Sequence, residues 1–163
     1  MRSARGEQVL TTWGGLVQRS RPLDWLVMTD HSDLLGMPSA LQAGDPEFVA
    51  ADKTLADWSA VMQMNDIGAA TPVAMAAIQA QGNGTLPEAA KSEEFFRRTW
   101  HDYTGIIESS NEPGRFTAMI GYEWTPNPVP GNNMHRNVVY RGGKAEADQI
   151  LPTRHSKASI PRI

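Results

Sequence analysis

The run Leu23-Asp24-Trp25-Leu26-Val27-Met28 constrains the fold of this chain more than any other segment. It is short and dense in apolar side chains, which is typical of a strand that is buried on both faces in a parallel sheet. The run ends on Thr29-Asp30-His31. In α/β barrels, active-site residues lie at the carboxyl ends of the buried strands, which is where these polar side chains are expected. The segment therefore predicts a parallel sheet with functional groups at its edge.

Two later apolar runs, over residues 116–122 and 137–140, predict two further strands. Between and around the strands, helical periodicity, capping residues and prolines predict helices. These helices are expected over residues 5–19, 46–64 and 72–81, and after Pro87-Glu88. Residues 31–45 and 125–133 are rich in Gly, Pro and polar residues and are expected to be loops. Long helical insertions between buried strands indicate an α/β architecture.

The composition limits the kinds of partner and site. The 163 residues are 40% apolar and 20% charged, which is typical of a folded, soluble domain. The net charge of -3 provides no excess of positive charge with which to bind nucleic acid or an acidic membrane. No run approaches the roughly 20 apolar residues of a membrane span, and the first residues lack the apolar core of a signal peptide. The sequence leaves a cytoplasmic and a periplasmic location equally open.

Histidine and carboxylate groups are the side chains in this chain that can bind a transition metal, because it contains no cysteine. His31 offers an imidazole, and Asp30 beside it can bind a metal directly or hold a ligand in place. A plainer interpretation is that Asp30 caps the following turn and His31 is an ordinary surface residue.

Glu123 follows the second predicted strand within Gly121-Tyr122-Glu123-Trp124. A carboxylate in an apolar setting needs a partner, because an unpaired buried charge is costly. A metal ion is one such partner. A salt bridge to Arg136 or Arg141 is the alternative.

His135 lies twelve positions after Glu123, within Asn133-Met134-His135-Arg136-Asn137. The intervening loop is long enough to return and place His135 near Glu123. Arg136 is suited to bidentate contact with a phosphate or sulfate. The alternative is a histidine at a loop edge beside a solvated arginine. Taken together, His31, Glu123 and His135 suggest one metal centre assembled from distant parts of the chain.

These motifs resemble those of the polymerase-and-histidinol-phosphatase (PHP) metallohydrolases. Residues 23–31 resemble the second PHP motif, residues 120–123 the glutamate motif, and residues 133–136 a histidine motif. The chain is most similar to a bacterial PHP-like family, domain of unknown function 3604, through the segments 113–125 and 131–138. The resemblance covers about residues 5–152. We expect residues 1–152 to form one incomplete PHP-like domain and residues 153–163 an atypical basic tail.

The resemblance implies a distorted (β/α) barrel that carries divalent metal ions (Zn, Mn or Fe) at its carboxyl face. It implies hydrolysis of a small-molecule phosphoester or related ester by metal-activated water. His31, Glu123 and His135 would be metal ligands, and Asp30 a ligand or the partner of one. We expect Asp30 and Arg136 to be catalytic, with Arg136 offsetting the negative charge that develops on the ester oxygens.

The His-x-His motif with which PHP proteins begin is missing from this chain. We therefore expect a partial barrel, an incomplete piece of a metal-dependent hydrolase that is inactive by itself. The alternative is an inert fragment or an anion-binding module that lacks the full ligand set.

Overall fold

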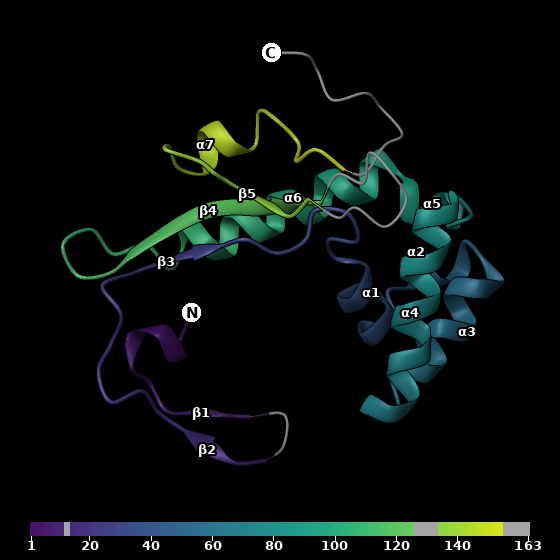
Figure 1. Cartoon of the computed structure of the whole chain (residues 1–163), viewed down its shortest axis with the longest axis horizontal. Coiled ribbons are helices and arrows are strands. Elements are labelled where there is room, and N and C mark those ends of the chain that lie inside the picture. The colour runs from purple at the N-terminus through teal and green to yellow at the C-terminus, as the bar shows by residue number, and fades with distance from the viewer. Residues whose placement is uncertain (12–13, 126–133, 155–163) are drawn as a thin grey trace. The chain divides into compact units, whose positions relative to one another are not determined.

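The computed structural model describes residues 1–11, 14–125 and 134–154. These residues form two compact units (Figure 1). Unit 1 comprises Met1–Asp33 and the residues from His101 onward, and unit 2 comprises Leu34–Trp100. None of the described helices is both long and apolar enough to cross a membrane.

A three-stranded sheet organises unit 1, in the order β3-β4-β5 (Figure 1). Its strands are β3 (Trp25–Met28), β4 (Thr117–Trp124) and β5 (Arg136–Val139). The three predicted strands are thus confirmed. The predicted parallel sheet is confirmed for β3 and β4, which are parallel, but not for β5, which pairs with β4 in the antiparallel direction. The connection from β4 to β5 is shorter than the helical crossovers that usually join parallel strands.

The predicted helix over residues 5–19 is wrong. A single 3-10 turn, η1 (Ser3–Arg5), precedes a hairpin of β1 (Val9–Leu10) and β2 (Leu16–Val17). Gly14 has φ +80°, in the left-handed region that glycine adopts without strain. A turn at this glycine reverses the chain. Of the apolar residues that suggested a helical face, Val9, Leu10, Leu16 and Val17 lie on the two short strands, and Trp13 lies outside the described residues.

Unit 1 also contains the second half of α6 (Glu93–Glu108) and α7 (Lys144–Ala147). Several apolar side chains of this unit are almost fully buried: Ile107, Phe116, Ile120, Tyr122 and Ala147. β3 is less buried than the sequence predicts, since Trp25 is 59% exposed. The apolar density of the run therefore predicts the strand correctly but overstates its burial.

Unit 2 is helical and has its own core. Its helices are α1 (Met37–Ala43), α2 (Pro46–Ala50), α3 (Lys53–Met62), α4 (Ile67–Asn83) and α5 (Glu88–Lys91), followed by the first half of α6. The core consists of Met37, Ala40, Leu41, Phe48, Leu55, Ala77 and Leu86. Its helices fill the long insertion between β3 and β4 that the sequence predicts.

The helix boundaries of unit 2 differ from the predicted ones because of capping residues. The predicted helix over 46–64 is two helices, since the Asp52 carboxylate accepts from the Thr54 N–H and starts α3 anew. Asp66 starts α4 in the same way, so Pro72 lies inside a helix that begins earlier than predicted. The predicted loop over 31–45 contains α1.

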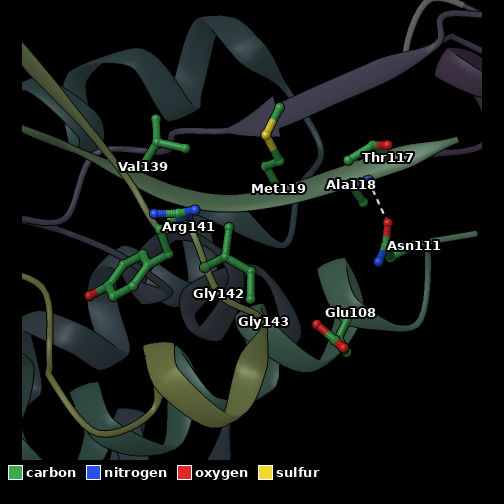
Figure 2. A pocket seen from close by; sticks show the side chains of 11 residues that line it. Glu108, Asn111, Thr117, Ala118, Met119, Val139, Arg141, Gly142 and Gly143 are labelled. Atoms are coloured by element: carbon green, nitrogen blue, oxygen red, sulfur yellow. Dashed lines mark hydrogen bonds between the residues drawn. The ribbon is translucent and has the colours of Figure 1, made fainter. Parts of the chain in front are cut away.

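The described residues therefore form a mixed α/β structure with two small sheets. No closed barrel is formed within the described part of the chain. A pocket of about 610 Å³ lies along the first half of β4 and the end of β5 (Figure 2). It is lined by Thr117, Met119, Val139 and Arg141 among others. This pocket lies toward the opposite end of β4 from Glu123.

Candidate metal centre

The parallel pairing of β3 and β4 brings His31 beside Glu123. The two residues form an isolated parallel bridge between His31, which follows the end of β3, and Glu123, which is still part of β4. The Glu123 N–H donates to the Asp30 carbonyl oxygen at 2.9 Å, and the Ser32 N–H donates to the Glu123 carbonyl oxygen at 2.9 Å. The backbone on both sides of His31 is thus fixed to Glu123.

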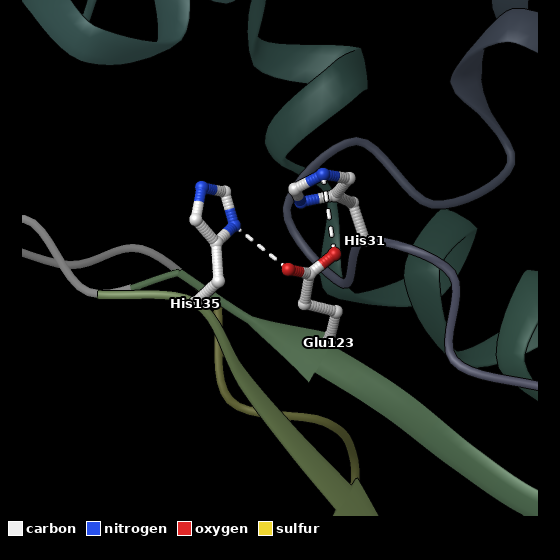
Figure 3. Close-up of side chains that lie close together, drawn as sticks. All are labelled: His31, Glu123 and His135. Carbon is white, nitrogen blue, oxygen red and sulfur yellow. Dashed lines mark ion pairs between the residues drawn. The ribbon is translucent and has the colours of Figure 1, made fainter. Parts of the chain in front are cut away.

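His135 reaches the same place through the antiparallel pairing of β4 and β5. Trp124 pairs with Arg136 at the start of β5, and His135 directly precedes that pair. The side chain of His135 turns toward the Glu123 carboxylate (Figure 3). Two pairings on either side of β4 therefore assemble three side chains from three segments of the chain.

The three side chains form a close cluster (Figure 3). His135 Nδ1 lies 2.7 Å from Glu123 Oε1, and His31 Nε2 lies 3.3 Å from Glu123 Oε2. One ligand atom from each residue lies within 4.8 Å of the other two. Ligand bonds to zinc are about 2.0–2.2 Å, so atoms this close need only small side-chain rotations to share one ion.

The burial of the cluster fits an accessible site at the edge of the sheet. The Glu123 side chain is 21% exposed, whereas the side chains of His31 and His135 are 58% and 50% exposed. Two imidazoles and a carboxylate are donors that suit zinc and other first-row divalent metals. The chemistry and spacing of these residues therefore fit a metal ion that remains open to solvent and small ligands.

Thr125 completes the cluster and has no counterpart in the sequence prediction. Its hydroxyl oxygen lies 3.3 Å from His31 Nδ1 and 3.1 Å from His135 Nδ1. Thr125 comes two residues after Glu123 and directly after β4, so strand alternation places both on the same face. That alternation is the one sequence signal that could have identified it.

Asp30 and Arg136, the two expected catalytic residues, are not in the His31–Glu123–His135 group. The Asp30 N–H donates to the Tyr103 hydroxyl at 3.4 Å. The Arg136 guanidinium lies over the Trp124 ring, 5.8 Å from its centroid. Side chains alternate along a strand, so Trp124 and Glu123 face opposite ways. Catalytic roles for Asp30 and Arg136 stay predictions.

The salt bridge considered for Glu123 is not found: in the described part of the chain, its carboxylate lies against His31 and His135 rather than an arginine. Asn132 and Asn133, beside the histidine motif, lie outside the described residues, as do residues 155–163 of the basic tail.

Two residues near the cluster, Ser32 and Tyr103, make hydrogen bonds that hold the backbone beside His31. Ser32 is fully buried, and its hydroxyl donates to the Thr153 carbonyl oxygen at 2.7 Å. Burial raises the pKa of the Tyr103 hydroxyl far above its ordinary value, so this group stays neutral. Both residues hold the segment on either side of His31.

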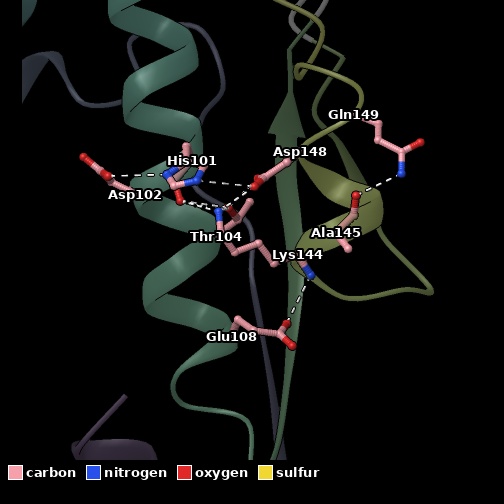
Figure 4. A network of polar contacts seen from close by, with 8 residues as sticks. All are labelled: His101, Asp102, Thr104, Glu108, Lys144, Ala145, Asp148 and Gln149. Carbon is pink, nitrogen blue, oxygen red and sulfur yellow. Dashed lines mark hydrogen bonds and ion pairs between the residues drawn. The ribbon is translucent and has the colours of Figure 1, made fainter.

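A second polar cluster joins α6 to α7 in unit 1 (Figure 4). Lys144 Nζ lies 2.5 Å from Asp148 Oδ2 and 2.9 Å from the Thr104 hydroxyl, which donates to Asp148 Oδ1 at 2.6 Å. Burial alone would raise the pKa of the Asp148 carboxyl, but the hydrogen bonds from Lys144 and Thr104 lower it overall. With Lys144 and Thr104 fully engaged, this cluster is a structural link.

The described residues thus define a mixed α/β protein with a candidate His–Glu–His metal centre at the edge of a small sheet. The chain belongs to the family described as Protein of unknown function (DUF3604), whose model matches residues 1–162. Searches of curated proteins and of solved structures found no match. The predicted membership of this family is confirmed, and a relation to the PHP superfamily stays a prediction.

Proposed function

We propose that His31, Glu123 and His135 bind a divalent metal ion (Zn, Mn or Fe) in a PHP-like hydrolase of phosphoesters or related esters. The observation that carries the proposal is the convergence of three ligand atoms within 4.8 Å from three separate segments. The PHP-like motifs of the sequence support the reaction class.

The placement of Glu123 favours a metal over a simple ion pair. Its carboxylate is the most buried group of the cluster, and its neighbours are two imidazoles that are charged only when protonated. A divalent ion would compensate the carboxylate and be held by both imidazole lone pairs at once. When bound, such an ion lowers the pKa of a coordinated water and polarises an ester oxygen.

The chain's own residues would hold and orient this site. The backbone hydrogen bonds of Glu123 to Asp30 and Ser32 fix two of the three ligands relative to each other. The exposed imidazoles leave one side of the cluster open to a small substrate. Arg136, one residue from His135, is proposed to contact a negatively charged ester after leaving the Trp124 ring.

Metal content tests the metal centre. After incubation with zinc, manganese or iron and removal of excess ion, we expect the wild-type chain to retain metal and the His31→Ala/Glu123→Ala variant to lose it. The matched control is His101→Ala/Asp102→Ala, which removes another exposed histidine and acid of unit 1 whose side chains lie 3.8 Å apart. Equal metal content in wild type and the His31→Ala/Glu123→Ala variant would contradict the proposal.

Activity tests the reaction class separately. The missing His-x-His motif predicts that this chain is inactive by itself, whereas a metal centre that suffices for turnover predicts metal-dependent hydrolysis by wild type that the same double variant lacks. A panel of phosphate, sulfate and carboxylate esters distinguishes the two outcomes. Arg136→Gln should lower kcat/KM for phosphate esters without changing metal content. Metal retention with no hydrolysis of any ester would instead identify a binding module without turnover.

A further inference from the structure

The outward face of α4 carries an apolar patch. The exposed large apolar residues of unit 2 all lie on α4 or just before it, and each is more than half exposed: Met64, Ile67, Met75 and Ile78. The opposite face of the helix is covered, since Val73 and Ala77 are buried. Large apolar side chains that gather on one surface mark a site of contact with another molecule. α4 therefore has one face in the core of unit 2 and one face without a partner among the described residues.

Charge is absent from α4. None of its 17 residues is acidic or basic, whereas the two other long helices, α3 and α6, carry both signs of charge. A helix that lacks a charged face is normally buried on all sides, and the cores of interfaces are depleted in charged residues. A charged partner finds no opposite charge on this helix. A second copy of the same helix buries no charge, so in its charge the patch matches itself.

The stripe of exposed residues on α4 is also complementary to itself in size. Its members lie three or four positions apart, with two of them side by side at the centre: Ile67, Thr71, Ala74, Met75, Ile78 and Gly82. We place a second copy of the helix antiparallel to the first, with a two-fold axis between Ala74 and Met75. Each large side chain then lies level with a small one: Met75 with the partner's Ala74, Ile78 with the partner's Thr71, and Ile67 with the partner's Gly82. Large side chains that pass beside small ones let two helices interdigitate.

The small members of the stripe suit burial. A Cβ at Gly82 meets nothing within 4 Å, so this end of the helix has room for a neighbour. The Thr71 hydroxyl donates to the Ile67 carbonyl oxygen at 2.8 Å within the helix, so its burial leaves no unpaired donor. The antiparallel direction also places the positive N-terminal end of each helix dipole beside the negative C-terminal end of the other.

The size of the contact sets its strength. The 17 residues of α4 span about 25 Å at about 1.5 Å per residue, and a helix is about 10 Å wide. One helix against one helix buries less than the roughly 800 Å² per partner of a standard stable interface. We propose that α4 docks on α4 of a second copy of this chain and forms a weak, reversible antiparallel dimer. This dimer is independent of the metal centre proposed above.

Sedimentation velocity of the full chain over a range of concentrations tests the dimer. Wild type should shift reversibly from monomer to dimer as its concentration rises from micromolar to millimolar. Thr71→Glu and Ile78→Lys should each weaken the association more than about tenfold, because an unpaired charge enters an apolar contact. The control is Thr54→Glu, the same change at an exposed threonine of α3, which should match wild type. Wild type that stays monomeric throughout, or unchanged association of either α4 variant, would overturn the proposal.

A mixture of the two α4 variants tests the register and the identity of the partner. When Thr71→Glu is mixed with Ile78→Lys, the new carboxylate on one chain lies level with the new ammonium on the other, so the dimer should return. Both positions are exposed, and circular dichroism checks that each variant is folded. Gly82→Trp is a second, uncharged disruption, since it fills the space that the partner's Ile67 needs. No recovery in the mixture, or full association of Gly82→Trp, would overturn the proposal.

Discussion

His31 and Glu123 form a parallel bridge in the same register as β3 and β4, three positions beyond the last strand pair, Met28 with Ile120. Their closeness is therefore a property of the backbone pairing and not of the two side chains. The two backbone positions should therefore stay close when either side chain is replaced. The site should be more sensitive to changes that disturb the pairing than its exposed position suggests.

Gly121→Ala should disturb this pairing strongly. A Cβ at Gly121 would lie 2.7 Å from the Val138 carbonyl oxygen and 3.0 Å from the Met28 carbonyl oxygen. Both atoms are backbone atoms of neighbouring strands and cannot rotate away. We expect a loss of about 1–3 kcal/mol in the free energy of unfolding, as for other overpacked sites, together with weaker zinc binding.

Urea unfolding measures the effect of Gly121→Ala, and Gly82→Ala is its control. A Cβ at Gly82, near the end of α4, meets nothing within 4 Å. That change should raise stability slightly, because alanine favours a helix over glycine. Equal stability of wild type and the Gly121 variant would contradict the close approach of the three strands.

Ser32→Ala should lower both the stability of the chain and the zinc affinity of the candidate metal centre. The fully buried Ser32 hydroxyl donates to the Thr153 carbonyl oxygen, and its removal leaves that acceptor without this partner. We expect a cost of about 1–3 kcal/mol and a lower zinc affinity, because Ser32 follows His31 directly. Ser109→Ala, which removes an exposed hydroxyl that donates to the Ile106 carbonyl oxygen, should change neither quantity.

Thr104→Val should loosen α7 from α6. The buried Thr104 hydroxyl bonds to both Lys144 and Asp148, and valine of similar shape offers neither contact. The expected cost is about 1–3 kcal/mol in thermal or urea unfolding. Zinc affinity should remain near that of wild type, because none of the three residues belongs to the His31–Glu123–His135 group. A large loss of affinity would show that this link supports the metal centre.

Asp148 should make stability depend on acid pH. Its pKa is held below the ordinary value of 3.8 in the folded chain, chiefly by hydrogen bonds that outweigh its burial. A folded pKa below the unfolded one contributes stability above pH 4, and this contribution is lost as the pH falls through the folded pKa. Asp148→Asn should therefore lower stability at neutral pH, and its difference from wild type should shrink below pH 4. A constant difference across this range would refute the assignment.

The strands could be predicted from the sequence because each of them coincides with a continuous run of apolar residues. The apolar runs over 23–28, 116–122 and 137–140 coincide closely with β3, β4 and β5. Apolar spacing alone failed in residues 5–19, because the same residues fit a helix face and a short hairpin. It also failed to divide the segment 46–64, where one side chain, Asp52, caps a new helix.

The sequence by itself determined which residue types can bind a metal: His31, Glu123 and His135 follow or precede strands, and no cysteine competes with them. Only the tertiary structure decided that these three converge, because a parallel and an antiparallel pairing meet on β4. It likewise decided that Thr125 joins the cluster and that Arg136 lies against Trp124. Strand register sets which side chains are neighbours, and register depends on contacts between segments that are distant in the sequence.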